Sequence, residues 1–211
     1  MMNNKFDTNQ LRMVVFANSV KHSGHCIAGK LVDTKKWVRP VANDLGAELS
    51  TQQIKYKNPY GEFLTKTLQI IKFTYLKQAP LINQPENYLI DDQAWKQNYS
   101  INESDINDYL DMPSDLWGSE DRVSYNEILN KEIIIKQSLY LVKVDDFKLH
   151  KNSNNKRRAS FVYNQASYDL AVTDPFFEKN SNRINELQNI LCISLGEEYR
   201  GSCFKLVAAI Y

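Results

Sequence analysis

The segment NSVKHSGHCIAGKLVDTKKWVRPV, residues 18–41, gathers the side chains best suited to chemistry. Imidazole, thiol, ammonium and guanidinium groups lie close together in it, on Lys21, His22, His25, Cys26, Lys30, Lys35, Lys36 and Arg39. Such groups build three kinds of site: a metal centre, a thiol nucleophile with a histidine base, and a basic surface for phosphate. The spacing of the residues favours the third kind, a basic surface.

A metal centre would lack ligands here. A structural zinc site takes four ligands, usually from two closely spaced pairs, whereas only His22, His25 and Cys26 lie near one another. Cys192 and Cys203 are isolated, and the sequence has no C-x-x-C pair. Phosphate-loop, G-x-S-x-G and H-E-x-x-H motifs are also missing from the sequence. We therefore expect no metal ion and no cofactor.

A cysteine nucleophile needs a base that the fold holds against it. His25 is the neighbour of Cys26 and would point to the opposite side of a strand, so His22 or His150 would have to be that base. A free cysteine is more often a small buried apolar residue. We favour that interpretation and keep a Cys26-dependent enzyme as an alternative.

Acidic residues are numerous, which makes a metal-dependent nuclease the second enzymatic alternative. Such an enzyme needs carboxylates that converge on magnesium, but no D-x-D or E-x-K pattern stands among basic residues in a predicted strand pair. Asp174, in the sequence VTDP, is the carboxylate of most interest. It could equally form an Asx turn or pair with an arginine. The sequence favours a protein that is not an enzyme.

The basic surface is the third interpretation. Lysine and arginine hold phosphates, and aromatic rings stack on bases. We expect nucleic acid to contact a set drawn from this segment and from a second basic group: Lys21, His22, His25, Lys30, Trp37, Arg39, Lys156, Arg157, Arg158, Tyr163 and Tyr168. The competing interpretation is that the charges are solvated and the aromatic residues, Trp37 above all, belong to the core.

Short β-strands dominate the hydrophobic pattern. Strands are predicted at 11–19, 26–32, 36–41, 67–76 and 138–151, followed by a hairpin at 159–175 and two strands in 190–211. The hairpin turns at Asn164-Gln165, between two alternating runs. Residues 92–135 are acidic and are predicted to be mainly helical. The fold class is therefore mainly β with helical insertions, and short strands of this kind suggest small barrels or sandwiches.

Composition gives the chain a core and no membrane anchor. The 211 residues have a formal net charge of +1 and are 43% hydrophobic. No apolar run approaches the roughly 18 residues of a membrane span, and MMNNKFDTNQ lacks the apolar segment of a signal peptide. Three cysteines without an export signal predict free thiols and a cytoplasmic location.

A series of segments, in chain order, forms a pattern over nearly the whole sequence. They are FANSVKHSGHCIAGKLVDTKKWVRPV, ENYLID with the following Trp95, LWGSEDRVSYNE, SLYLVKVDDFKL, KRRASFVYN, LAVTDP and ISLGEEYRGSCFKLVAAIY. This pattern resembles the dual OB-fold domain family of bacteria and archaea. One departure is His25, where arginine is common in the family. A neutral imidazole would weaken a phosphate contact there near pH 7.

The resemblance implies two OB-like barrels packed in one compact chain. On that basis we expect a flexible N-terminus at 1–10, a first barrel at 11–80, a helical and loop insert at 81–137 and a second barrel at 138–211. The resemblance also implies nucleic-acid binding and an association with prokaryotic defence systems, where a protein partner would be found.

The function expected from the sequence is binding of single-stranded or structured DNA or RNA in a basic groove on the paired barrels. The enzymes considered above are one alternative. A protein-interaction or small-ligand sensor module that uses the same barrels is another. We expect no membrane partner.

Overall fold

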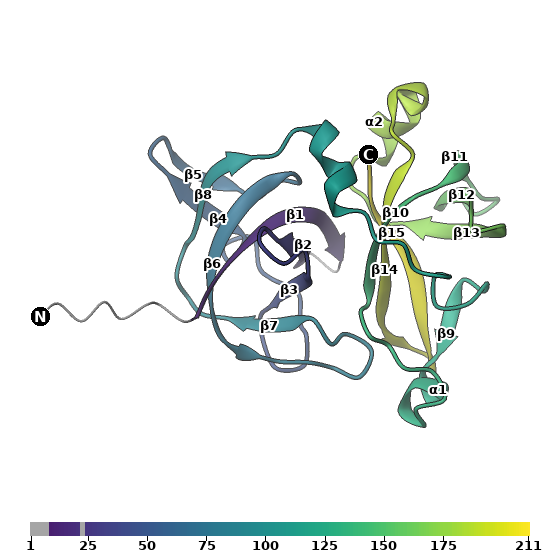
Figure 1. The fold of residues 1–211 in the computed structure, drawn as a ribbon, viewed down its shortest axis with the longest axis horizontal. Helices are drawn as coiled ribbons and strands as arrows, with labels where there is room; N and C mark the ends of the chain where they lie inside the picture. The colour runs from purple at the N-terminus through teal and green to yellow at the C-terminus, as the bar shows by residue number, and fades with distance from the viewer. Residues whose placement is uncertain (1–8, 22–23) are drawn as a thin grey trace, which may run out of the picture.

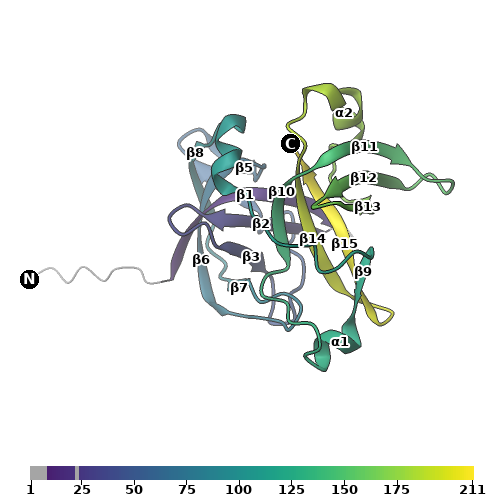
Figure 2. The ribbon, with the colours of Figure 1, turned by 45° about the vertical axis from the view of Figure 1, so that its right-hand side comes forward.

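The computed structural model describes residues 9–21 and 24–211 and shows two β-barrels lying side by side (Figures 1 and 2). The first barrel runs from purple to teal in Figure 1 and the second from green to yellow. The predicted fold class, mainly β with helical insertions and two OB-like barrels, is confirmed. Among the described residues, no helix is long and apolar enough to cross a bilayer.

The first barrel is a closed ring of five strands. They are β1 (Gln10–Lys21), β2 (Gly24–Leu31), β3 (Trp37–Val41), β6 (Gln69–Gln78) and β7 (Asn87–Ile90). Their order is β1-β2-β3-β7-β6, and β6 pairs again with β1. The β3–β7 pair is parallel and the other neighbours are antiparallel. This is the strand order of an OB-fold barrel.

Three more strands extend the first sheet beyond the barrel. The hairpin of β4 (Lys55–Asn58) and β5 (Gly61–Leu64) joins it through β8 (Trp95–Ser100), which pairs with both β4 and β6. The outer face of β1, β6, β8 and β4 is therefore one continuous surface.

The second barrel repeats the OB order with different strands. They are β10 (Leu139–Lys143), β11 (Asp145–Lys151), β12 (Arg157–Tyr163), β13 (Ala166–Val172), β14 (Ile190–Tyr199) and β15 (Ser202–Ile210). The order is β10-β14-β15-β13-β12-β11, with β13 and β15 parallel. Val144 alone separates β10 from β11, so the two ends of the sheet are halves of one bent strand. A short strand, β9 (Arg122–Ser124), pairs with β15.

Helices are few and short. They are η1 (Glu103–Tyr109), α1 (Tyr125–Leu129), α2 (Phe177–Asn182) and η2 (Ile184–Glu186). The expectation that residues 92–135 are mainly helical is wrong, because this part also holds β8 and β9 and long irregular stretches. The strand β8 forms because its Trp95 packs inside the first barrel against Phe73.

The first barrel extends past the expected boundary at residue 80. Strand β7 must be included because it closes the ring between β3 and β6, and β8 adds to the same sheet. The connection between the barrels is therefore 101–138 rather than 81–137. Most of the N-terminus expected to be flexible, 1–10, lies outside the described residues.

Two local features explain how these residues form these strands. Asn164 and Gln165 have φ angles of 45° and 67°, the left-handed pair that a tight two-residue hairpin requires between β12 and β13. Gly29 is needed for a different reason, since a Cβ there would lie 2.2 Å from the carbonyl oxygen of Val14 on the paired strand. The hairpin predicted at 159–175 is confirmed, with its turn at Asn164-Gln165.

Each barrel has its own core, and a third core joins them. The joining core takes Phe16 and Trp37 from the first barrel, Tyr109 from η1, and Leu141 and Cys192 from the second. All five side chains are nearly or completely buried. Because this contact is apolar and continuous, it fixes the barrels against each other.

Candidate nucleic-acid interface

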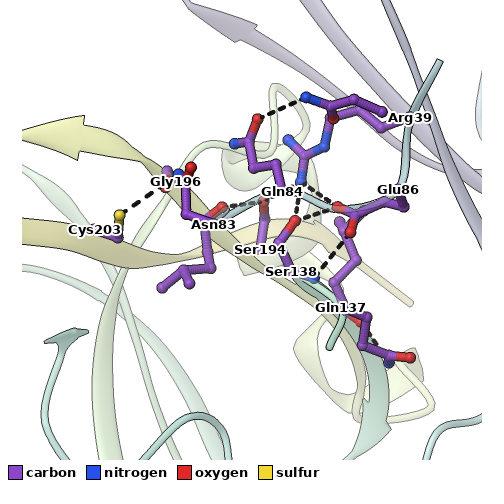
Figure 3. Close-up of polar contacts among 12 residues, drawn as sticks. Arg39, Asn83, Gln84, Glu86, Gln137, Ser138, Ser194, Gly196 and Cys203 are labelled. Carbon is purple, nitrogen blue, oxygen red and sulfur yellow. Dashed lines mark hydrogen bonds and ion pairs between the residues drawn. The ribbon is translucent and has the colours of Figure 1, made fainter. Parts of the chain in front are cut away.

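A buried ionic network crosses the junction between the barrels (Figure 3). Arg39 on β3 donates from Nη2 to Ser138 Oγ at 2.8 Å and to Ser194 Oγ at 3.4 Å, and lies 3.3 Å from Glu86 Oε1. Glu86 also accepts from the backbone N–H of Ser138 at 3.1 Å and from its hydroxyl. Arg39 is 8% exposed and Glu86 is 7% exposed. This guanidinium therefore connects the barrels rather than facing solvent.

A second buried network surrounds Asp111. Lys30 donates from Nζ to Asp111 Oδ1 at 2.7 Å and to the carbonyl of Tyr109 at 2.6 Å. The Trp37 indole N–H and the Leu141 backbone N–H both donate to Asp111 Oδ2, at 2.9 Å and 2.8 Å. Burial lowers the pKa of Lys30, and the ion pair with Asp111 opposes that effect. Lys30 and Trp37 are thus structural.

Tyr163 and Tyr168 point into the second barrel. Their hydroxyls donate to the carbonyls of Pro113, at 2.8 Å, and Gly118, at 3.2 Å. Burial raises the pKa of both phenols. The Tyr168 ring stacks on Phe161 with centroids 5.4 Å apart. Both rings belong to the core and have no free face for a base.

Five of the expected contacts are therefore withdrawn from the binding set because they are buried: Lys30, Trp37, Arg39, Tyr163 and Tyr168. His25 is half-buried, and its ring nitrogens lie 3.2 Å from Asn18 Oδ1 and 3.4 Å from Thr51 Oγ1. Lys21 ends β1 opposite Gly24. The expected contacts of the Lys21 side chain and of His22 lie outside the described part of the chain.

The second basic group remains at the surface of the second barrel. Lys156 is exposed in the turn before β12. The Arg157 side chain is 40% exposed, lies 3.8 Å from Glu178 and contacts the ring of Phe177. Arg158 is less available, since it donates to Asp169 Oδ1 at 2.8 Å. The basic residues therefore gather at the N-terminal end of β12, with Arg157 on the side of the buried Ala159 and Arg158 on the outer face.

A cavity of about 400 Å³ lies between the barrels beside this face, and we call it the inter-barrel groove. Ser19, Val20 and Cys26 of the first barrel line one side of it. Ala171 and Leu206, which pair across β13 and β15, line the other side. Arg39 and Arg158 also reach its wall. The groove is thus largely apolar, and both cations and the acids Asp121 and Glu197 lie along its wall.

Two aromatic rings on the β14–β15 hairpin also line the groove. Tyr199 is 58% exposed, and the Phe204 ring lies 6.4 Å from it between centroids. Each ring has an arginine over it: Arg200 lies 5.1 Å from the Tyr199 centroid and Arg122 lies 4.5 Å from that of Phe204. The pairing of β9 with β15 places Arg122 directly opposite Phe204.

These four residues are absent from the sequence-based set, although a signal for them exists. In SCFKLVA, Phe204 alternates with the buried Cys203 and Lys205, which predicts a ring on the outer face of the strand. Arg200 and Gly201 have φ angles of 53° and 80° and form the tight turn that exposes Tyr199. Only the pairing with β9, which is distant in sequence, brings Arg122 to the site.

Lys205 is a buried cation at the end of the groove. Its ammonium donates to the carbonyl of Gly118 at 2.6 Å and lies over the Tyr168 ring. Burial lowers its pKa from 10.5 to about 8. Between these two values the unfolded chain binds a proton that the folded chain does not, so Lys205 makes stability rise with pH.

Lys205→Met is expected to remove this rise in the free energy of unfolding between pH 8 and 10.5. Urea titrations at neutral pH and near pH 10 measure it, with Lys143→Met at the exposed end of β10 as the matched control. An unchanged pH dependence in Lys205→Met, relative to Lys143→Met, would show that Lys205 keeps its ordinary pKa.

Asp174, the carboxylate of most interest in the sequence, is placed for structure. Among the described residues, no three His, Cys, Asp or Glu side chains are grouped to hold a metal. Asp174 is 4% exposed and accepts from the backbone N–H of Phe176 at 2.7 Å and of Ile210 at 3.0 Å. The first of these contacts is an Asx turn. Burial raises the pKa of the Cys203 thiol to about 11, which disfavours its thiolate at neutral pH.

The two barrels and their shared core define a tandem OB-fold protein. The sequence model of a protein family, the dual OB-containing domain, matches residues 11–210, and the chain belongs to that family. No curated protein matches the sequence. A solved structure, described as the crystal structure of the tetrameric p202 HIN2, aligns with 96% of this chain and 89% of its own at 10% identity. Its TM-score is 0.34.

Proposed function

We propose that this protein binds single-stranded nucleic acid along the inter-barrel groove and the adjoining outer face of β12. The carrying observation is the pair of rings, Tyr199 and Phe204, each with an arginine over it at the groove. Aromatic rings beside cations are the usual means of holding bases and phosphates of a single strand. OB folds bind such strands on this sheet face and with the loops that border it.

The proposed contacts differ from those expected from sequence. Bases would stack on Tyr199 and Phe204, while Arg200 contacts an adjacent phosphate. Arg122 is paired with Asp121 at 2.7 Å and would exchange that partner for a phosphate. Lys156, in the turn between β11 and β12, and Arg157, the first residue of β12, would extend the phosphate path. Binding in this form does not require the buried cations, which hold the barrels together.

Tyr199→Ala combined with Phe204→Ala is expected to weaken binding at least ten-fold, since a stacked base contributes about 1–3 kcal/mol. Fluorescence anisotropy of labelled oligothymidine and oligouridine across a salt series measures it. The matched control is Phe176→Ala, an exposed ring at the start of α2. Lys156→Glu with Arg157→Glu should lower affinity and make the salt dependence shallower. Equal affinity of the ring variant and the control would contradict the proposal.

The setting of this activity is also a proposal. It is a cytoplasmic role in a prokaryotic defence system, in which a partner protein would act on the bound nucleic acid. Co-purification from the protein's native cells, with and without nuclease treatment, separates a protein partner from one held through nucleic acid.

One observation favours a second candidate, a small anionic ligand in the groove. Arg39 lines the groove, and its Nε atom is buried without a hydrogen-bond partner in the described part of the chain. Because that atom is buried, a carboxylate or phosphate in the groove would accept from it only after the guanidinium turns toward the groove. A rise in melting temperature with mononucleotides, combined with no binding of oligonucleotides, would favour this candidate over the first.

A further inference from the structure

Four cations stand in register across four adjacent strands of the first barrel. Arg12 on β1 is paired with Lys72 on β6, Lys72 with Lys96 on β8, and Lys96 with Lys57 on β4. We call these four residues the cationic row. Neighbouring strands are about 4.8 Å apart, so the row extends for about 14 Å across the sheet.

The row lies on the outer face of the barrel. Each cation has a sequence neighbour that is buried in the barrel core. These neighbours of Arg12, Lys72, Lys96 and Lys57 are, in that order, Met13, Ile71, Trp95 and Tyr56. Side chains alternate between the faces of a strand, so the cations point away from that core. Arg12, Lys57 and Lys96 are exposed, and Lys72 is half-buried.

The row is not neutralised within the described part of the chain. Lys57 has an acidic partner, Glu62, at 3.2 Å. Arg12, Lys72 and Lys96 form no ion pair with any acid among the described residues. Like charges directly opposite each other destabilise a sheet, so this arrangement has an energetic cost that an anionic ligand would remove.

An exposed aromatic ring stands beside the row. Tyr99 on β8 is paired with Ile70 on β6, two rungs from the Lys72–Lys96 pair and, because of a bulge between them, on the same face. Its side chain is 68% exposed. A flat row of cations beside a free ring suits the phosphates and bases of a nucleic acid better than an acidic protein, whose interfaces are built around buried apolar anchors.

We propose that the cationic row and Tyr99 form a second contact surface for single-stranded nucleic acid, which rests on the nucleic-acid binding proposed above. Ser19 lies at the edge of the inter-barrel groove. Arg12, at the start of the row, is seven positions before it on β1, which corresponds to a distance of up to about 23 Å along the strand. The two surfaces are therefore separate, and a long strand could contact both while a short one contacts one at a time.

The test is Lys72→Glu combined with Lys96→Glu, measured by anisotropy with labelled oligothymidine and oligouridine across a salt series. We expect at least ten-fold weaker binding and a log–log salt slope reduced by about 1.4, which corresponds to two lost phosphate contacts on a single strand. The control with the same change in charge is Lys131→Glu with Lys143→Glu, two exposed lysines in the connection after α1 and at the end of β10. Tyr99→Ala should weaken binding and Tyr99→Phe should restore it, because stacking needs the ring and not the hydroxyl.

The outcomes separate this inference from the proposed function. If the wild-type protein binds, and the row variant binds as tightly as the control with the same salt slope, the second surface is wrong and the groove proposal stands. If the wild-type protein binds neither oligonucleotide at low salt, the proposed function fails and the second surface fails with it. Weaker binding by the row variant than by its control supports the second surface, and weaker binding by the Tyr199→Ala, Phe204→Ala variant supports the groove.

Discussion

Arg39→Leu is expected to lower the free energy of unfolding by about 3–5 kcal/mol, because it leaves the buried carboxylate of Glu86 without its counter-ion. Glu86 lies where the loop after β6 meets the second barrel, and it is only 7% exposed. The substitution also removes the donor shared by Ser138 and Ser194. Urea denaturation followed by far-ultraviolet circular dichroism measures the loss.

Two comparisons show whether burial is the cause. Lys77→Leu removes a cation from an exposed pair with Asp44, in which both side chains are 57% exposed, and should cost less than about 1 kcal/mol. Arg39→Leu combined with Glu86→Leu should recover much of the stability, because no buried charge is left unpaired. A loss in Arg39→Leu no larger than in Lys77→Leu would refute the structural role of the network.

The strands were largely predictable because their signals are local. The hairpin at 159–175 follows from strict alternation around Asn164-Gln165, and the structure shows a tight turn there with alternate side chains buried. The acidic region 92–135 was predicted less well. Its charges suggest helix faces, whereas β8 forms because Trp95 and its neighbours complete a sheet made by distant strands.

The roles of the basic residues were not predictable from their local sequence. Lys30 and Arg39 are residue types that bind phosphate, yet both are buried. Each forms an ion pair with an acid that is distant in the sequence, Lys30 with Asp111 and Arg39 with Glu86. A sequence pattern shows that a cationic side chain is present. It does not show whether the folded chain places an acidic side chain beside it. Only the tertiary contacts decide between a ligand site and an internal ion pair.

The residues of the two proposed surfaces were missed for a related reason. Arg12, Lys72 and Lys96 lie on three strands and are isolated in the sequence, so they become one row only through strand register. Phe204 and Arg122 likewise meet through the β9–β15 pair. The register between distant strands depends on which face of each strand is buried. A single sequence specifies that register only once the order of the strands in the sheet is known.

Asp111→Ala is expected to destabilise the fold by about 3–5 kcal/mol at neutral pH, since it leaves the buried Lys30 ammonium unpaired. The indole N–H of Trp37 and the backbone N–H of Leu141 lose their acceptor as well. Urea denaturation measures the loss, and Asp108→Ala, an exposed acid of η1, is the matched control.

The pH dependence of the Asp111→Ala variant identifies Lys30 as the source of its instability. Burial already lowers the Lys30 pKa in the wild-type protein, and Asp111 is the partner that raises it again. Without Asp111 the folded-state pKa falls further below 10.5, so the unfolded chain binds the extra proton over a wider pH range and stability rises with pH across that range. The deficit relative to Asp108→Ala should therefore shrink between neutral pH and pH 10. A deficit that stays constant over this interval would mean that the lost hydrogen bonds to Trp37 and Leu141, and not the Lys30 charge, account for the effect.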